Sequence, residues 1–211
     1  MYSSNWEDDR FSVEALELRQ TDIVGKPPRI TGIDVDAMSV EQRNLISSLR
    51  AAISANDSRI AEYFLILAKY PALLQSQLAL GTVLFNGKLT PRERELSILR
   101  VGRLCRAPYE WSEHVKIAKR YGVTASEIER VALGSEAEGW SEHEAAILRA
   151  VEQLFAVQMI DDETWEILAR TWDEQQLIEL PGLVGQYIAV ALIQNSIRLR
   201  LEKDSEGLSS R

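Results

Sequence analysis

Residues 91–131 read "PRERELSILRVGRLCRAPYEWSEHVKIAKRYGVTASEIERV", and this stretch predicts a helical hairpin. Thr90, just before it, and Glu93 form a capping box, in which a hydroxyl and a carboxylate satisfy the free amides of a first helical turn. Pro91 stands at the first helical position, where its missing N–H costs nothing. We therefore predict a helix from residue 91 and, after a short turn, a second helix over residues 109–121.

Similar helix starts occur on both sides of this hairpin, and no stretch alternates as a strand would. The other capping boxes are Ser39 with Gln42, Thr124 with Glu127, and Ser141 with Glu144. The predicted helices are residues 40–54, 58–69, 72–86, 91–105, 109–121, 125–133, 142–157, 162–171 and 174–202. Gly122 and Gly134 follow two of them, where a left-handed cap favours glycine. The fold class predicted is all-α.

The chain divides into one helical domain with two short ends. Residues 1–35 are expected to form an extended N-terminal arm, because Pro27 and Pro28 forbid a helix there. Residues 36–204 form the helical domain, and 205–211 a flexible tail. Pro181 should kink or split the last helix, whose remainder is apolar nearly all round and is typical of a central or intersubunit helix.

Composition excludes several classes of function. Apolar residues make up 45% of the 211 residues and charged residues 27%, which is typical of a globular domain. The net charge of −8, with no basic block, disfavours nucleic acids and anionic membranes as partners. We expect a soluble, cytoplasmic protein, because there is no secretory signal or membrane span and a lone cysteine, Cys105, suits a reducing compartment.

The hairpin also carries an acid-base pattern. Glu95 shares a helical face with the apolar Ile98 and Leu99, and a carboxylate on an apolar face is typical of a general acid or base. Glu110 and His114 are four residues apart, so their side chains can touch on the next helix. The neighbouring carboxylate would favour the protonated imidazole.

Each of these residues also has a purely structural interpretation. A Glu–His pair on a helix is more often a satisfied hydrogen bond than a catalytic dyad. Cys105 is most simply a small core residue, and His143 is expected to be solvent-exposed with no role. No metal is expected, because the two histidines lie far apart in sequence and have no cysteine partner.

The stretch resembles the carboxymuconolactone decarboxylase family, whose members share an all-α fold with alkyl hydroperoxidase D. The resemblance extends over roughly residues 60–200 through "YPALLQSQLALGTVLFNGKL" and "DDETWEILARTWDEQQLIELPGLVGQYIAVALIQNSI". It implies a homo-oligomer, a trimer or hexamer. Hydroperoxidases of this family carry a Glu on one helix and Cys-x-x-Cys-x-x-x-His on the next. Alignment on His114 puts Glu95 at the acidic position but Ala107 and Glu110 at the cysteine positions, so a dithiol relay is impossible.

The resemblance to the non-redox members implies a role for each residue. His114 would donate a proton, and Glu95 and Glu110 would tune it. Arg100 or Arg103 would hold the substrate's anionic group. Tyr109 and Trp111 would wall the pocket. No cofactor is required, because decarboxylation needs only an electron sink in the substrate and a proton.

Three functions stay open at this stage. The first is a lyase acting on a small carboxylated lactone or related unsaturated acid. The second is a peroxidase, of the peroxiredoxin kind, with residual activity at Cys105. The third is a non-catalytic oligomeric binding protein in which the Glu–His pair holds two helices together. A ligand-sized pocket lined by Glu95 and Glu110 would favour catalysis, and a filled core would oppose it.

Overall fold

The protein is described here by a computed structural model, which covers residues 9–52 and 61–211. Within these ranges the chain forms helices and turns and no strand, so the predicted all-α class is confirmed. The α-helices are α1 (Val13–Val24), α2 (Val40–Ala52), α3 (Glu62–Leu67), α4 (Pro71–Phe85), α5 (Pro91–Leu104), α6 (Pro108–Arg120), α7 (Ala125–Leu133), α8 (Glu142–Val157), α9 (Asp162–Ala169) and α10 (Glu174–Ile197).

Capping set most of these boundaries. All four predicted capping boxes form, each with its backbone and side-chain hydrogen bonds. Gly122 and Gly134 adopt the left-handed region, with φ of 82° and 111°. The parts of the predicted helices at 53–60 lie outside the described residues.

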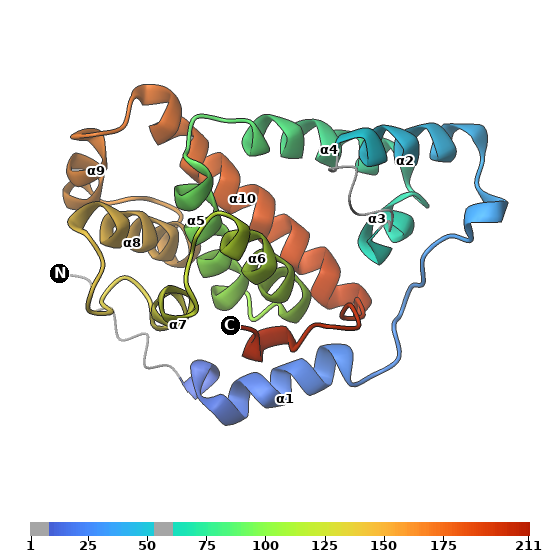
Figure 1. Cartoon of the computed structure of the whole chain (residues 1–211), viewed down its shortest axis with the longest axis horizontal. Coiled ribbons are helices and arrows are strands. Elements are labelled where there is room, and N and C mark those ends of the chain that lie inside the picture. The colour runs from blue at the N-terminus through green and yellow to red at the C-terminus, as the bar shows by residue number, and fades with distance from the viewer. Residues whose placement is uncertain (1–8, 53–60) are drawn as a thin grey trace.

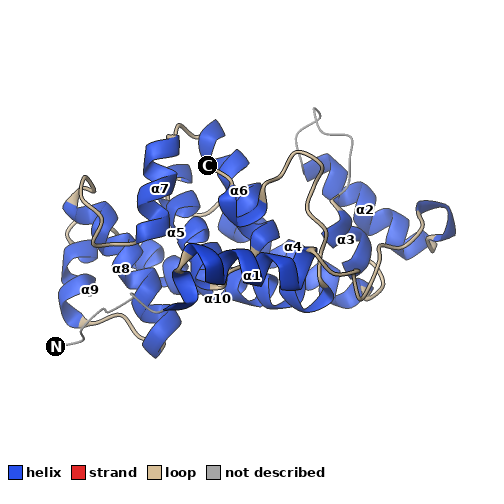
Figure 2. Ribbon diagram, turned by 90° about the horizontal axis from the view of Figure 1, so that it is seen from below, coloured by secondary structure: helices blue, strands red, loops and turns tan. Residues whose placement is uncertain are grey.

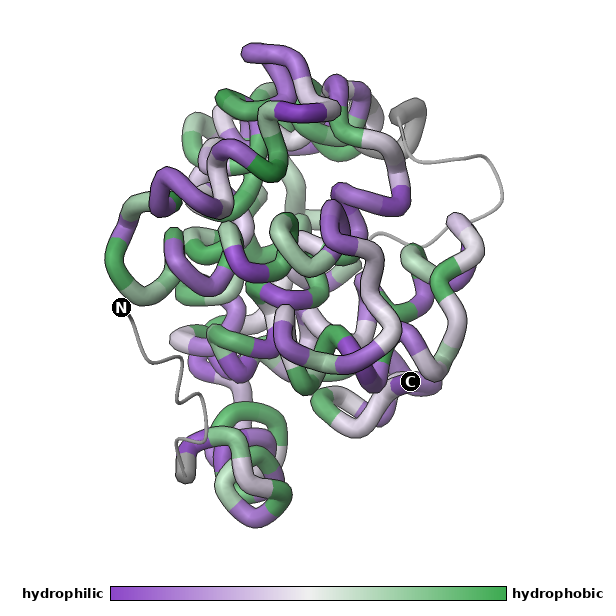
Figure 3. Tube along the Cα trace, turned by 90° about the vertical axis from the view of Figure 1, so that its left-hand side faces the viewer, coloured by the Kyte–Doolittle hydropathy of each residue, from purple (hydrophilic) through white to green (hydrophobic). Residues whose placement is uncertain are grey.

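Helices α5 and α10 form the centre of the molecule (Figure 1). One face of α5 packs on α8 and α10, and another packs on α6 and α7. Helices α2, α3 and α4 extend to one side, where they form a third apolar cluster with the end of α10. Hydrophobic and hydrophilic segments alternate along the tubes in Figure 3, as amphipathic helices require.

Helix α10 runs without interruption through Pro181, so the predicted split does not occur. By length and composition alone it is long enough and apolar enough to cross a membrane. It nevertheless packs against α4, α5, α6, α8 and α9, which is the position of a core helix.

Two predictions about the chain ends were wrong. The described part of the N-terminal arm contains α1, which starts at an N-cap by Ser12 and buries Leu16 and Ile23; the segment 26–34 that follows is not helical. Figure 2 shows α1 lying along the body of the protein. The C-terminal residues are not a free tail, because Leu208 is buried in the cluster that contains α6 and α7. Both corrections have one cause: a few apolar side chains find partners that are distant in sequence.

Candidate active site

The hairpin of α5 and α6 brings Glu95, Glu110 and His114 together. Glu95 Oε2 lies 2.7 Å from His114 Nδ1, and Glu110 Oε1 lies 3.4 Å from His114 Nε2. The imidazole is therefore held between two carboxyl groups, one on each nitrogen. This is the convergence that the sequence predicted.

The local sequence explains the close approach of the two helices. Arg106 adopts a left-handed conformation with φ of 46°, and Ala107 donates its N–H to the Gly102 carbonyl at 2.9 Å, so the chain reverses at once. Gly102 has no side chain, and a Cβ there would lie 3.3 Å from the backbone nitrogen of Trp111. Glycine thus lets α5 and α6 pack tightly enough for Glu95 to reach His114.

The cluster is nearly withdrawn from solvent. Glu95 is 0% and Glu110 is 2% exposed, while 13% of the His114 side chain remains accessible. Burial raises the pKa of Glu110 to about 7, although His114 and a hydrogen bond from Gln194 oppose this. For His114, burial favours the neutral ring, but Glu95 and then Glu110 outweigh it and raise its pKa above the ordinary value. Glu110 therefore titrates around neutral pH, and the protonated form of His114 is favoured.

Three further residues complete the cluster. Arg94 donates from Nε to Glu95 Oε1 at 3.1 Å, and its guanidinium lies 4.2 Å from the centre of the Phe85 ring. The Tyr187 ring meets His114 edge to face, with ring centres 5.1 Å apart. Gln194 hydrogen-bonds Glu110. Two buried polar atoms here, Arg94 Nη2 and Gln194 Oε1, have no hydrogen-bond partner.

The two arginines predicted to hold an anionic substrate make other contacts instead. Arg100 donates to Glu152 Oε1 at 2.8 Å and to the carbonyls of Val131 and Ala132, so it ties α5 to α7 and α8. Arg103 lies over the Trp111 ring beside Arg211, on the side of the C-terminal segment. Their positions on α5 direct both guanidinium groups into other packing, away from Glu95.

The two aromatic residues predicted to wall a pocket belong to the core. Trp111 is fully buried between α5 and α7, and its indole N–H donates to the Ser210 carbonyl at 3.0 Å. Tyr109 packs in the cluster of α2, α3 and α4, and its hydroxyl lies 3.5 Å from Glu202. The aromatic wall of the cluster is Tyr187 instead.

The prediction that His143 is solvent-exposed was wrong. It is half-buried, its Nε2 lies 2.9 Å from Glu93 Oε1, and its ring meets Trp172 edge to face at 5.2 Å. The Trp172 indole donates to the same Glu93 oxygen at 2.9 Å. This second Glu–His pair ties α5 to α8 and to the segment just before α10.

Cys105 is half-buried at the end of α5, and burial together with Glu110 raises its pKa to about 12. A thiol with this pKa is a poor source of thiolate. Among the described residues, no group of three or more His, Cys, Asp or Glu side chains is placed to hold a metal ion.

The fold and the site together define an all-α protein with a Glu–His–Glu cluster on a tight helical hairpin. Residues 71–153 match the carboxymuconolactone decarboxylase family, which confirms the resemblance seen in the sequence. No curated protein sequence matches the chain.

Solved structures have the same fold. An uncharacterized peroxidase-related protein from Ralstonia eutropha JMP134, described as an alkylhydroperoxidase AhpD core, aligns with a TM-score of 0.72 at 17% identity, over 85% of this chain and 95% of that chain. A putative antioxidant defence protein AhpD from Agrobacterium tumefaciens gives 0.61 at 18% identity, over 65% and 96%. The debrominase Bmp8 bound to 2,3,4-tribromopyrrole gives 0.63 at 18%, over 82% and 91%. At these identities the likeness shows the fold alone.

Proposed function

We propose that this protein is a cofactor-independent lyase that uses His114 as a proton donor to a small carboxylated lactone or related unsaturated acid. The observation that carries the proposal is the cluster itself: one imidazole held at 2.7 Å and 3.4 Å by two buried carboxyl groups. The two carboxyl groups raise the pKa of His114 and so favour the protonated imidazole, which is the state a general acid needs.

The reaction is balanced within the substrate and the imidazole. The bond between the ring carbon and the carboxylate breaks, carbon dioxide leaves, and the electron pair passes through the double bond to the lactone carbonyl. The resulting enolate takes a proton from His114 on carbon, and solvent returns that proton to the ring. Glu95 orients the imidazole and stabilises its charge throughout.

Arg94 replaces Arg100 and Arg103 as the group we propose for the substrate's negative charge. It is 3% exposed, it already touches Glu95, and its Nη2 has no partner. A buried guanidinium N–H without an acceptor is costly, and a carboxylate or enolate oxygen would satisfy it. The complex of Bmp8 with a bromopyrrole supports a small ring as the kind of molecule this fold takes.

The test is a pair of matched histidine variants. We expect His114→Gln to lose at least about 100-fold in kcat/KM on a carboxylated unsaturated lactone, because a positioned proton donor contributes about 10²–10⁴-fold. His143→Gln removes the other Glu–His pair and should keep its activity. Both would be followed by the loss of the substrate's conjugated absorption and by the release of carbon dioxide.

A second function, a non-catalytic binding protein, is favoured by one observation. The cluster is packed, and none of its three residues lines the cavity described below. If His114 only held the helices, His114→Gln would melt several degrees early. Turnover by that variant at the rate of the unchanged protein would contradict the lyase.

We predict no dithiol-dependent peroxidase activity. Ala107 and Glu110 stand where the family has cysteines, and a pKa of about 12 leaves Cys105 thiolate at roughly 10⁻⁵ of the thiol at pH 7. Reduction of an organic hydroperoxide by dithiothreitol should stay at the uncatalysed rate, with and without Cys105→Ser. Catalysed reduction that disappears in Cys105→Ser would prove this wrong.

The assembly and location also stay proposals. Apolar side chains exposed on α4 and α10, among them Val83, Ile178 and Leu192, support a homo-oligomer, for which we propose a trimer or hexamer. The acidic chain and its small-molecule chemistry suit the cytoplasm, without nucleic acid or membrane as partner.

A further inference from the structure

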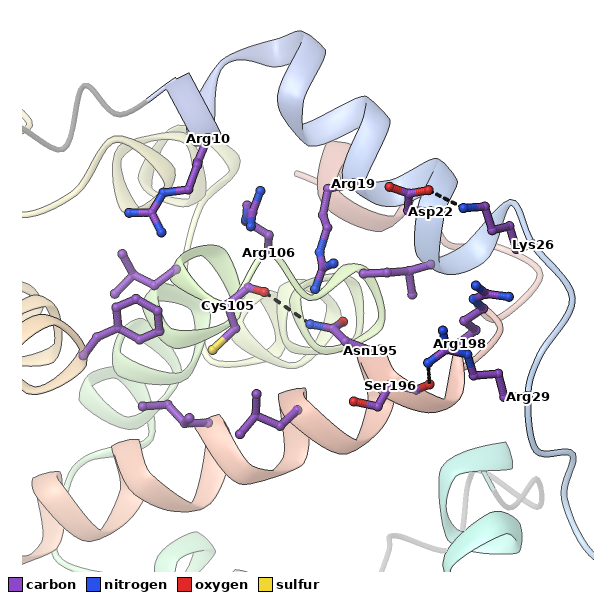
Figure 4. A pocket seen from close by; sticks show the side chains of 15 residues that line it. Arg10, Arg19, Asp22, Lys26, Arg29, Cys105, Arg106, Asn195, Ser196 and Arg198 are labelled. Carbon is purple, nitrogen blue, oxygen red and sulfur yellow. Dashed lines mark hydrogen bonds and ion pairs between the residues drawn. The ribbon is translucent and has the colours of Figure 1, made fainter.

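A cavity of about 560 Å³ lies between α1, the turn that joins α5 to α6, and the end of α10 (Figure 4). One part of its wall is apolar and includes Leu104, Phe155 and Ile188. The other part is cationic. Its positively charged residues are Arg10, Arg19, Lys26, Arg29, Arg106 and Arg198.

The charge of this wall is opposite to that of the protein. The whole chain carries −8, yet the described residues that line the cavity include six cationic side chains and one carboxylate, Asp22, which pairs with Lys26 at 2.5 Å. The cations come from segments that are far apart in sequence. Like charges gathered in one concave site repel one another and create a strong field for an anion.

Two of the cationic residues have an unusual backbone conformation. Arg106 and Arg198 end α5 and α10 in the left-handed region, with φ of 46° and 56°. Glycine is the usual residue at such positions, because a side chain strains the left-handed backbone. The third such non-glycine residue in the described chain is Gln158, which does not line the cavity. Both left-handed arginines therefore sit at this one cavity.

Side-chain contacts hold the cationic wall in place. Arg29 Nη1 donates to the Ser196 carbonyl at 3.0 Å, which keeps this arginine at the end of α10. Figure 4 shows Arg19 extending from α1 toward Asn195. Arg19 Nε is buried and has no hydrogen-bond partner. An anion with oxygen acceptors would satisfy that N–H.

We propose that this cavity binds a small organic dianion, a molecule with two negative charges on an apolar body. The cationic wall would take the charged groups and the apolar wall the body, and the volume lies within the roughly 300–1,000 Å³ of ligand sites. None of Glu95, Glu110 and His114 lines the cavity, so the site is distinct from that cluster and does not rest on the proposed lyase.

The ligand class can be tested by calorimetry with isophthalate, benzoate, isophthalamide and inorganic phosphate at low ionic strength. We expect isophthalate to bind at least about tenfold more tightly than benzoate, since one more charge-assisted contact is worth about 1.4 kcal/mol. The neutral amide should not bind, and phosphate should bind more weakly because it leaves the apolar wall empty. Equal affinity for benzoate and isophthalate, phosphate binding as tightly as isophthalate, or no isophthalate binding at millimolar concentration, would overturn the proposal.

The decisive variant is Arg198→Gly, because glycine suits the left-handed cap and should leave stability equal or higher. We expect it to weaken isophthalate binding at least tenfold, and Arg19→Met to do the same. Two controls should bind normally: Gln158→Gly makes the same backbone change elsewhere, and Arg200→Met removes one positive charge nearby that does not line the cavity.

Two results would overturn the assignment to these residues. One is unchanged isophthalate binding by Arg198→Gly. The other is an equal loss in Arg200→Met, which would mean that only the general field matters. His114→Gln should bind isophthalate as the unchanged protein does, so a failure of the lyase proposal and a failure of this one are distinguishable.

Discussion

Replacing Arg100 with methionine is expected to lower the free energy of unfolding by about 3–5 kcal/mol, because it leaves a buried carboxylate without its counter-charge. The Arg100 and Glu152 side chains are each 4% exposed, and the guanidinium also donates to two carbonyls of α7. Methionine keeps the volume of the arginine stem but supplies no charge and no N–H. Urea titration at pH 7 would measure the loss.

Arg92 provides a matched control on the same helix. Like Arg100, it links α5 to both α7 and α8, here through Glu127 and Glu144, but 33% of its side chain is exposed. Solvent screens such a pair, so Arg92→Met should cost no more than about 1 kcal/mol.

A double variant separates the buried charge from lost packing. Arg100→Met with Glu152→Met removes both charges and should recover part of the loss, because a buried ion pair is often replaceable by apolar side chains. If Arg92→Met and Arg100→Met lowered the free energy of unfolding equally, that result would contradict the structural role that the contacts assign to Arg100.

The sequence predicted those features of the fold that depend on residues close along the chain. The bounds of α7 and α8 were obtained without error, because the capping boxes at Thr124 and Ser141, and Gly134 after α7, are local signals. Helix α1 was not predicted, because Pro27 and Pro28 were taken to exclude a helix from the whole segment 1–35. Prolines can end a helix, but they do not prevent one upstream.

The site was predicted where helical spacing determines it. Glu110 and His114 are one turn apart, and a tight hairpin brings Glu95 to the same ring, as observed. Spacing on α5 did not determine which arginine would reach the cluster. That choice depends on residues from other elements, since Phe85 stacks on Arg94 and Glu152 captures Arg100.

Helix α10 supplied contacts that the hairpin alone could not reveal. Tyr187 and Gln194 both reach the cluster from this helix. Their only signal in the sequence was polarity within an otherwise apolar segment, "LVGQYIAVALIQNSI". A polar side chain in a buried helix needs a hydrogen-bond partner, so the polarity of these two residues indicates buried polar contacts.

The second large effect expected is on the pH dependence of stability, and it comes from Glu110. Its pKa rises from 4.5 in the unfolded chain to about 7 in the folded protein. Between these values the unfolded chain releases the proton first, so stability falls as pH rises. The shift lowers the free energy of unfolding by about 3 kcal/mol between these two pH values.

His114 acts in the same direction. Its folded pKa is raised, so its contribution is complete below the unfolded pKa and is lost as pH rises through the folded value. The carboxylates with lowered pKa values, such as Glu127 at about 2, change stability only at more acidic pH. Measurement from pH 5 to pH 8 therefore reports on the Glu110 and His114 pair.

Glu110→Gln should remove most of this decline. Glutamine keeps the shape and a hydrogen bond to the imidazole but does not titrate, so the variant should be more stable than the unchanged protein at pH 8 by about 3 kcal/mol and similar to it at pH 5. Urea midpoints at half-unit pH intervals would show the two curves separating. The control is Glu113→Gln, a neighbouring carboxylate with a 29% exposed side chain paired to Lys116, which should leave the slope unchanged. If Glu110→Gln keeps the full decline, Glu110 is not the group that titrates. The carboxyl beside His114 would then be ionised throughout this range and could act only as a fixed charge.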